Sequence, residues 1–189
     1  MRYSPAVVIA ALATLSSQAF AQEPSYRPPR IEVDVVGGYT FVNAESWSGF
    51  TSIHSSNQVS YGALARFLFV NFSDARLGVE VGMQQFFSYE VQASGGSQTL
   101  TRTFNVNGFH FAPMIRLAEG ARSSLDIGVG FHFLGDETVP GIIINSNHAL
   151  FRGRKFSIPL GARVNFVLND PASAANLALK AGVSMPLGQ

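Results

Sequence analysis

The sequence predicts an all-β fold: an eight-stranded, antiparallel, up-and-down transmembrane β-barrel. Charged residues make up only 13% of the chain, Lys occurs only at Lys155 and Lys180, and hydrophobic residues reach 47%. After the N-terminal segment, no apolar run approaches the roughly 18 residues of a membrane-spanning helix. Apolar and polar residues instead alternate with the period of two that is typical of strands.

Residues 1–21 have the features of a cleavable export signal. Arg2 precedes a short apolar run, and Ala-Phe-Ala at 19–21 fits a small-residue cleavage site. Residues 22–30 contain three prolines and are expected to form an extended periplasmic lead-in, followed by the barrel over 31–189. The chain has no Cys, which excludes disulfides. Without the signal it has twelve bases and twelve acids, so it offers no basic face to a nucleic acid.

Eight segments carry the alternation that predicts strands. They span 31–43, 58–72, 76–91, 99–117, 124–134, a poorly patterned segment within 141–151, 156–168 and 176–187. Counting the sixth segment gives the even number that bacterial barrels have, with short turns and longer loops on opposite sides. The expected turns are 73–75, 118–123 and 153–154, and the expected loops are 44–57, 92–98, 135–140 and 169–175.

The fourth predicted strand changes phase along its length. Phe104 and Val106 occupy even positions, whereas Phe109 and Phe111 occupy odd positions. One extra residue would restore the register, so the pattern predicts a β-bulge near 107–108.

The apolar side of the strands is predicted to face outward, toward lipid. The opposite side is small, and an eight-stranded barrel has an interior just wide enough for side chains. Its glycines are Gly38, Gly62, Gly78, Gly82, Gly128, Gly130, Gly161 and Gly182. Its charges are few and nearly balanced, which suits a closed interior because an unpaired buried charge is costly. The charges expected in the lumen are Glu32, Asp34, Arg66, Arg76, Glu80, Asp126, Arg163 and Lys180, with Glu90 and Arg116 on the same side.

Aromatic residues gather near the strand ends, like the two belts that flank the apolar band of a membrane barrel. The belt expected on the loop side comprises Tyr39, Phe41, Tyr61, Phe87, Tyr89, Phe104, Phe131, Phe133 and Phe166. The belt expected on the turn side comprises Phe69, Phe72, Phe151 and Phe156. Alternation alone also fits a soluble, lipocalin-like periplasmic barrel that carries an apolar ligand, with the apolar side inside.

The C-terminal segment has the order polar, any, Gly, any, any, apolar, any, apolar at Lys180, Gly182, Met185 and Leu187. It resembles the signal that the insertion machinery of outer-membrane barrels reads, although that family usually has aromatic residues where this chain has Met185 and Leu187. With the export signal and the strand count, residues 31–189 resemble the small outer-membrane β-barrel superfamily of the OmpA transmembrane domain and OmpX. The resemblance implies a location in the outer membrane of a Gram-negative bacterium.

No catalytic, cofactor or metal site is predicted. The four His residues have no i, i+2 or i, i+4 spacing, and His132 lies about six residues from Asp126 along one strand. A lipid A-modifying enzyme is nevertheless an alternative, and it would require a Ser–His contact on the lipid-facing rim of the loop side.

The first long loop, 44–57, contains the only Trp, Trp47, beside Phe50. These residues form a candidate contact for an extracellular partner, or else the loop folds back over the barrel mouth. The expected function is a non-enzymatic structural or surface-interaction role, not that of a general porin, because Arg, Glu and Asp fill so narrow a barrel. The expected partners are outer-membrane lipid and, during biogenesis, the barrel-assembly machinery.

Overall fold

The computed structural model describes residues 28–72, 75–95, 98–119, 122–134, 136–169 and 172–187. The predicted signal 1–21 and most of the lead-in 22–30 lie outside these residues. Among the described residues, no helix is long and apolar enough to cross a membrane.

Eight long strands form the fold. They are β1 (Arg30–Phe41), β3 (Val59–Phe72), β4 (Ala75–Gly95), β5 (Gln98–Glu119), β6 (Ser123–Leu134), β7 (Glu137–Arg152), β8 (Ser157–Val167) and β9 (Ala174–Pro186). The poorly patterned sixth segment is thus a strand, β7, which is longer than predicted and shifts its register with β8 between Ala149 and Phe151. One further short strand, β2 (Ser55–Asn57), lies in the first loop and pairs with β4.

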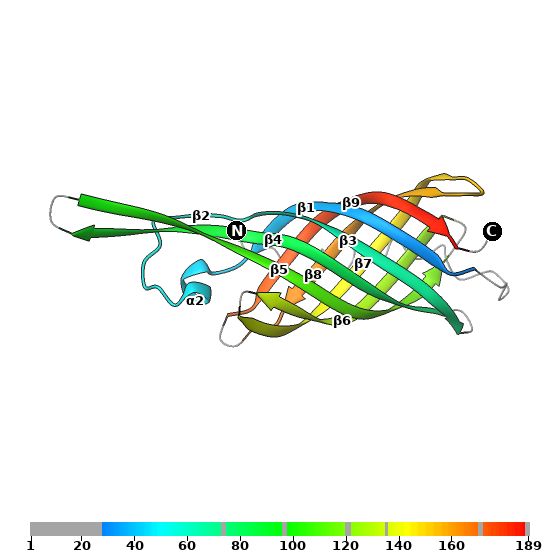
Figure 1. The fold of residues 1–189 in the computed structure, drawn as a ribbon, viewed down its shortest axis with the longest axis horizontal. Coiled ribbons are helices and arrows are strands. Elements are labelled where there is room, and N and C mark those ends of the chain that lie inside the picture. Colours follow the sequence, from blue (N-terminus) through cyan, green and yellow to red (C-terminus); the bar gives the residue numbers. More distant parts are fainter. Residues whose placement is uncertain are drawn as a thin grey trace.

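Each long strand pairs antiparallel with its neighbour in the chain, and β1 pairs with β9. Tyr39 lies opposite Leu177 and Arg30 lies opposite Pro186, so the pairing between the first and last strands runs along the whole of β1. The result is the predicted closed, up-and-down barrel (Figure 1). Closure matters because it leaves no exposed sheet edge along the barrel wall.

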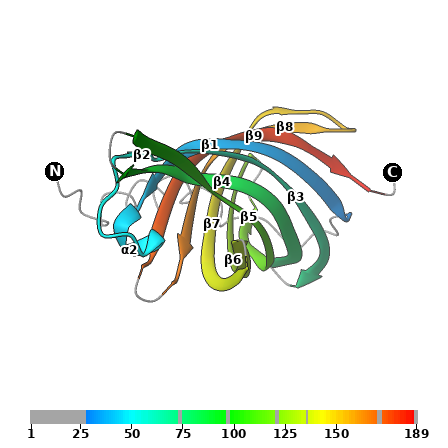
Figure 2. The ribbon, with the colours of Figure 1, turned by 60° about the vertical axis from the view of Figure 1, so that its left-hand side comes forward.

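The two ends of the barrel differ (Figure 2). We call the end that carries the start of β1, the end of β9 and the β3–β4, β5–β6 and β7–β8 connections the turn end. The opposite end, which carries the first long loop and the β4–β5 hairpin, is the loop end.

The β4–β5 hairpin projects far beyond the barrel at the loop end (Figure 1). Pairing continues from Gln85 and Asn107 to Gly95 and Gln98. The predicted loop 92–98 is therefore wrong, because strand pairing continues through most of it. The Thr-rich and Ser-rich sequence of this segment suits an antiparallel ribbon whose outer side meets water.

The predicted bulge near 107–108 is also wrong. β5 runs through these residues without interruption, and its even positions face inward from Phe104 to Arg116. The register shift lies across the ladder, between Gln85 and Phe87 of β4, where Phe86 is the extra residue. After this bulge, the odd positions of β4 face inward instead of outward, so the side chains between Phe87 and the hairpin tip change sides.

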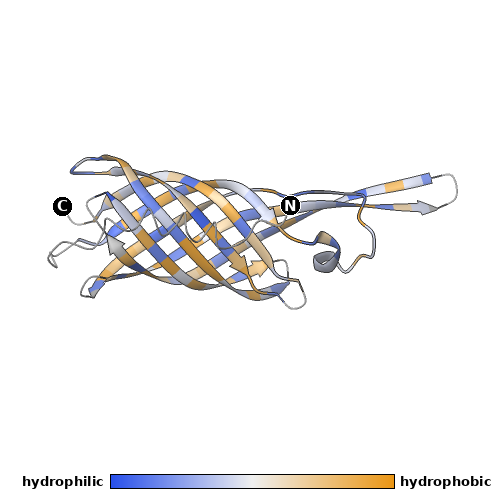
Figure 3. Cartoon of the chain, turned by 180° about the vertical axis from the view of Figure 1, so that it is seen from behind, coloured by the Kyte–Doolittle hydropathy of each residue, from blue (hydrophilic) through white to orange (hydrophobic). Residues whose placement is uncertain are grey.

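Hydropathy alternates along the strands of the barrel wall (Figure 3). Outward side chains are apolar and exposed, for example Val35 at 64%, Met83 at 70%, Val129 at 63% and Leu179 at 71%. Inward neighbours such as Asp34 and Lys180 are buried. The barrel wall therefore has its apolar side outside and its polar side inside.

Candidate functional site

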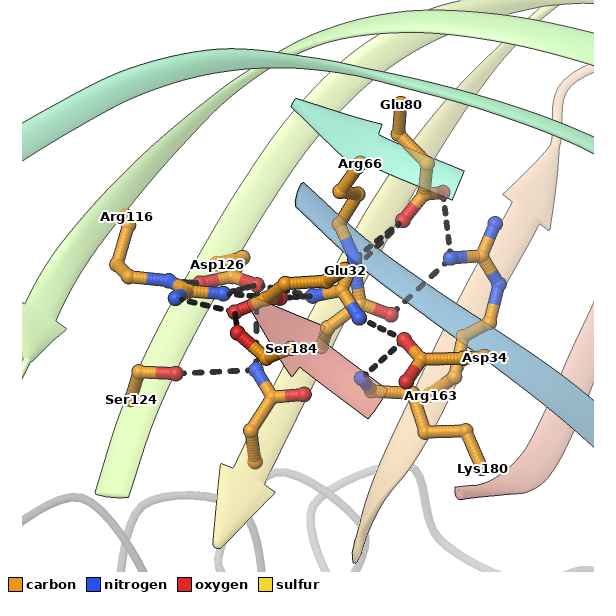
Figure 4. Close-up of polar contacts among 12 residues, drawn as sticks. Glu32, Asp34, Arg66, Glu80, Arg116, Ser124, Asp126, Arg163, Lys180 and Ser184 are labelled. Carbon is orange, nitrogen blue, oxygen red and sulfur yellow. Dashed lines mark hydrogen bonds and ion pairs between the residues drawn. The ribbon is translucent and has the colours of Figure 1, made fainter. Parts of the chain in front are cut away.

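The part of the interior toward the turn end holds an ionic cluster of four acids and four bases (Figure 4). We define the ionic cluster as Glu32, Asp34, Arg66, Glu80, Arg116, Asp126, Arg163 and Lys180. Each member is at most 3% exposed. Period-two alternation brings them together, because each occupies an inward position of its strand. The formal charges of the cluster cancel.

Arg66 of β3 lies at the centre of the ionic cluster. Its Nη1 is 2.6 Å from Asp126 Oδ2 and 3.2 Å from Glu32 Oε2. Its Nη2 donates to Asp34 Oδ2, and its Nε is 3.4 Å from Glu80 Oε2. One guanidinium thus contacts carboxylates from three other strands, β1, β4 and β6, and joins strands far apart around the barrel.

Arg116 of β5 forms the second junction of the cluster. It donates through two nitrogens to the two carboxylate oxygens of Glu32, at 2.9 and 2.8 Å. It also donates to Asp126 at 2.6 and 3.0 Å. Paired guanidinium–carboxylate bonds of this kind fix orientation as well as charge. Glu32 and Arg116 lie 84 residues apart in the chain, and the barrel stagger brings them together.

The remaining charges close the cluster at its edges. Lys180 Nζ donates to Asp34 Oδ2 at 3.0 Å, and Arg163 Nη1 donates to Glu80 Oε1 at 2.6 Å. His110 Nε2 lies 2.9 Å from the same Glu80 oxygen. Its ring fits because Gly82 stands opposite, where an added Cβ would meet the imidazole.

Above the ionic cluster, toward the loop end, the interior becomes apolar. The apolar cluster comprises the buried residues Ala44, Phe86, Phe87, Tyr89, Val139, Val167 and Ala174. Phe87 has no exposed surface, and Tyr89 stacks on Phe104 with ring centroids 5.3 Å apart. The bulge at Phe86 creates this cluster, because it turns Phe87 and Tyr89 inward. The assignment of Phe87, Tyr89 and Phe104 to the outer aromatic belt is therefore wrong.

The other aromatic residues predicted for the loop-side belt face outward. Tyr39, Phe41, Tyr61, Phe131, Phe133 and Phe166 are all exposed. At the turn end, Phe69, Phe151 and Phe156 are also exposed, whereas the side chain of Phe72 lies outside the described part of the structure.

The first long loop folds back onto the apolar cluster. Asn43 caps the short helix α2 (Ala44–Ser48) by accepting a hydrogen bond from the backbone of Glu45 at 3.2 Å. Helix α2 directs Trp47 against Phe87, with ring centroids 5.8 Å apart at 85°. Phe50 packs at 6.1 Å from Phe104 and keeps 43% of its surface exposed. Of the two candidate contact residues, Phe50 is thus the more accessible.

Of the other residues singled out in the sequence, Glu90 lies at the loop end and the rest lie in the part of the barrel toward the turn end. Arg76 is buried apart from the ionic cluster, donating from Nε to Asn71 at 3.1 Å and from Nη2 to the carbonyl of Pro28. In the C-terminal motif, Lys180 belongs to the ionic cluster, and Gly182 pairs with Asp34 of β1. Met185 is 44% exposed on the outer wall, and Leu187 N donates to the carbonyl of Pro29 at 2.7 Å. Glu90 lies in the projecting hairpin, outside the lumen, where it accepts from Ser55 at 2.9 Å.

One Ser–His contact occurs near the barrel rim. Ser123 Oγ lies 3.1 Å from His148 Nδ1, where the two residues pair across β6 and β7. This contact is at the turn end, whereas the enzyme alternative requires it at the loop end. No carboxylate of a described residue lies within ion-pair distance of His148, so nothing there would orient the imidazole.

The remaining histidines face each other in the interior. His110 and His132 stack with ring centroids 5.6 Å apart, between the ionic and apolar clusters. His110 occupies an inward position in line with Ala112 and Arg116. Among the described residues, no group of three or more His, Cys, Asp and Glu side chains could hold a metal ion.

Comparisons with known proteins support the architecture. No protein-family model matches the sequence, and no curated protein matches it either. Among solved structures, Neisserial surface protein A superposes with a TM-score of 0.50 at 11% identity, covering 84% of this chain and 97% of that one. A designed transmembrane β-barrel gives 0.48 at 12% identity over 88% and 100%. OprG from Pseudomonas aeruginosa gives 0.46 at 8% identity over 86% and 97%.

At such low identity, the likeness to Neisserial surface protein A bears on the fold alone. It agrees with the closed, antiparallel strand order of this chain. The resemblance predicted from the sequence is confirmed at this level: the chain has the eight-stranded fold of the small outer-membrane β-barrels.

Proposed function

We propose that this chain is a non-enzymatic protein of the bacterial outer membrane with a structural or surface-interaction role. The observation that carries the proposal is the inverted distribution of side chains on the barrel wall. Apolar residues face outward on every long strand, while the charges of the ionic cluster are buried. A closed barrel satisfies its backbone hydrogen bonds internally, so it can stand in hydrocarbon.

The same observation argues against a soluble carrier of an apolar ligand. Such a barrel would bury its apolar side chains and expose charge to water. Here Met83, Val129 and Leu179 are each more than 60% exposed, on strands that lie apart around the wall. A continuous apolar surface of that kind is typical of a lipid-facing or partner-covered protein.

A general porin function is disfavoured because buried side chains fill the lumen. The ionic cluster lies toward the turn end, the apolar cluster lies toward the loop end, and hydrogen-bonded polar side chains such as Gln84 and Asn176 lie between them. A water-filled channel needs a wider barrel than eight strands provide. The proposal therefore predicts little or no conductance.

Contacts with partners are assigned to three parts of the chain. The apolar wall would meet membrane lipid, and the C-terminal motif at Lys180, Gly182, Met185 and Leu187 would be read by the barrel-assembly machinery. The first loop, 44–57, would meet an extracellular partner through Phe50, which remains 43% exposed above the apolar cluster. The lipid A-modifying alternative lacks support, because the Ser123–His148 contact is at the turn end.

The first test is a heat-modifiability gel on the detergent-extracted outer-membrane fraction. A folded membrane barrel should migrate differently before and after boiling. Recovery of the protein in the soluble periplasmic fraction, with no shift on boiling, would overturn the proposal.

A conductance measurement tests the non-porin part separately. The purified barrel, inserted into a planar bilayer, should give no regular open steps in potassium chloride. Stable steps that disappear when the protein is boiled would show that the two clusters do not close the lumen.

A further inference from the structure

The connection between β7 and β8 forms a distinctive tip at the turn end (Figures 1 and 2). Its sequence is Phe-Arg-Gly-Arg-Lys-Phe over 151–156. Gly153 N donates to the carbonyl of Phe156 at 2.9 Å and closes the turn. The rings of Phe151 and Phe156 lie 5.3 Å apart at the base of the tip. We call residues 151–156 the basic tip.

Side chains change character in a fixed order along this hairpin. The outer wall carries Leu150, Ile158 and Leu160, which are 64%, 39% and 43% exposed. The exposed phenyl rings of the basic tip come next, at 48% and 42%. The exposed bases Arg152, Arg154 and Lys155 come last. This order matches the passage from hydrocarbon through the bilayer interface to the headgroups, where aromatic rings and long basic side chains are favoured.

Among the residues whose exposure the structure describes, exposed charge differs between the two ends of the barrel. The exposed charges of this set at the turn end are basic: Arg122, Arg152, Arg154 and Lys155. Those at the loop end are mostly acidic: Glu45, Asp136 and Glu137, with Arg102 as the base. An anionic ligand would be attracted to the exposed bases of the basic tip.

We infer that the basic tip binds the phosphate headgroups of anionic glycerophospholipids, such as phosphatidylglycerol, in the leaflet at the turn end. The inference rests on the proposed membrane function and names a lipid class and a site for it. The ligand is inferred to be a lipid and not a free phosphate, because the phenyl rings would hold the three bases at the bilayer surface. Each base near an anionic surface contributes about a fivefold gain in affinity.

The test compares lipid selectivity in bilayers. The full barrel is folded into phosphatidylcholine vesicles that contain spin-labelled phosphatidylglycerol or spin-labelled phosphatidylcholine, and the motionally restricted fraction of each label is measured. Insertion is checked first by heat modifiability. One variant removes the charge (Arg152→Gln, Arg154→Gln, Lys155→Gln), and a matched control keeps it (Arg152→Lys, Arg154→Lys, Lys155→Arg). Single Gln variants provide separate measurements if the triple variant folds poorly.

The unmodified barrel should restrict phosphatidylglycerol several-fold more than phosphatidylcholine, and 0.5 M salt should weaken the preference because it screens exposed charge. The Gln variant should lose the preference, each single variant should lose part of it, and the charge-preserving control should keep it. An inserted barrel without the preference, or a Gln variant that retains it, would overturn the inference and leave the proposed function standing. A chain that does not insert at all would overturn both.

Discussion

The two ends of the barrel interior hold different clusters. Toward the turn end, the interior holds the ionic cluster beside buried apolar residues such as Leu64 and Leu68, and the wall outside it is apolar. Toward the loop end, the interior is the apolar cluster around Phe87. The outer side of the projecting β4–β5 hairpin there is polar, with exposed Thr99, Thr101 and Thr103. The paired strands β4 and β5 are apolar on their outer side near the turn end and polar on their outer side in the projecting hairpin.

The surroundings of a strand determine which of its two sides is apolar. Hydrophobic side chains leave water for whichever apolar environment is available. In the proposed membrane setting, that environment is lipid around the wall and the barrel interior at the loop end. The loop end thus has the inward apolar side chains of a soluble protein.

Removing the central cation should have the largest effect on stability. Arg66→Ala leaves Glu32, Asp34, Glu80 and Asp126 with three bases in place of four. Breaking a buried charge network in this way should cost about 4 kcal/mol. Equilibrium urea unfolding of the barrel in phospholipid vesicles would measure it.

Arg163→Ala is the matched control, because within the ionic cluster Arg163 pairs with Glu80 alone. Its loss of stability should be clearly smaller. Equal losses for the two variants would mean that Arg66 does not hold the cluster together.

Truncating the side chain at the centre of the apolar cluster should cause the second-largest loss of stability. Phe87→Ala opens a cavity at a fully buried position and should cost about 3 kcal/mol. Trp47, the only Trp, packs on Phe87, so its fluorescence emission should shift to the red. Arg66→Ala should leave that emission unchanged, because its contacts lie in the other half. A red shift in both variants would show that the two halves are not independent.

A charge added to the outer surface should have a smaller effect on stability, and its size should differ between the barrel wall and the projecting hairpin. Leu179 and Leu100 are almost equally exposed, at 71% and 69%. Leu179→Arg, in the middle of β9, should cost about 2 kcal/mol because it meets hydrocarbon. Leu100→Arg, on the projecting hairpin, should cost less than about 0.5 kcal/mol because it meets water. The same urea titration measures both, and equal costs would contradict the assignment of different surroundings.

Sequence periodicity predicted seven of the eight long strands, and the even strand number of bacterial barrels added the sixth. The inverted wall was predicted from the small inward residues, the balanced charges and the aromatic belts, because alternation alone also fits a soluble barrel. Periodicity failed where the strand register and the surroundings change together. In β4 the odd positions from Leu77 to Val91 are apolar except at Gln85, although the bulge at Phe86 turns the positions after it inward. In β5 the apolar phase breaks between Val106 and Phe109, although the backbone is regular. The shift in β4 is thus marked only by Gln85, whereas the change of phase in β5 occurs where the backbone is regular.

The partners within the ionic cluster could not be predicted from the sequence. Alternation assigns Glu32 and Arg116 to the inward side, but it does not say that they meet. That contact depends on the stagger of strands around the closed barrel, which joins residues 84 positions apart. The contact of His110 with Glu80 could not be predicted either, because it too depends on which inward residues meet inside the barrel.

The most direct test of two surroundings on one barrel is fluorescence quenching from within the bilayer. In a Trp47→Phe background, Leu179→Trp and Leu100→Trp each give a chain with a single Trp at an equally exposed site. Both are folded into vesicles of lipids with brominated acyl chains. The emission of Leu179→Trp should be strongly quenched and that of Leu100→Trp should not. Equal quenching, or none at Leu179→Trp, would contradict the account of an apolar wall that faces lipid.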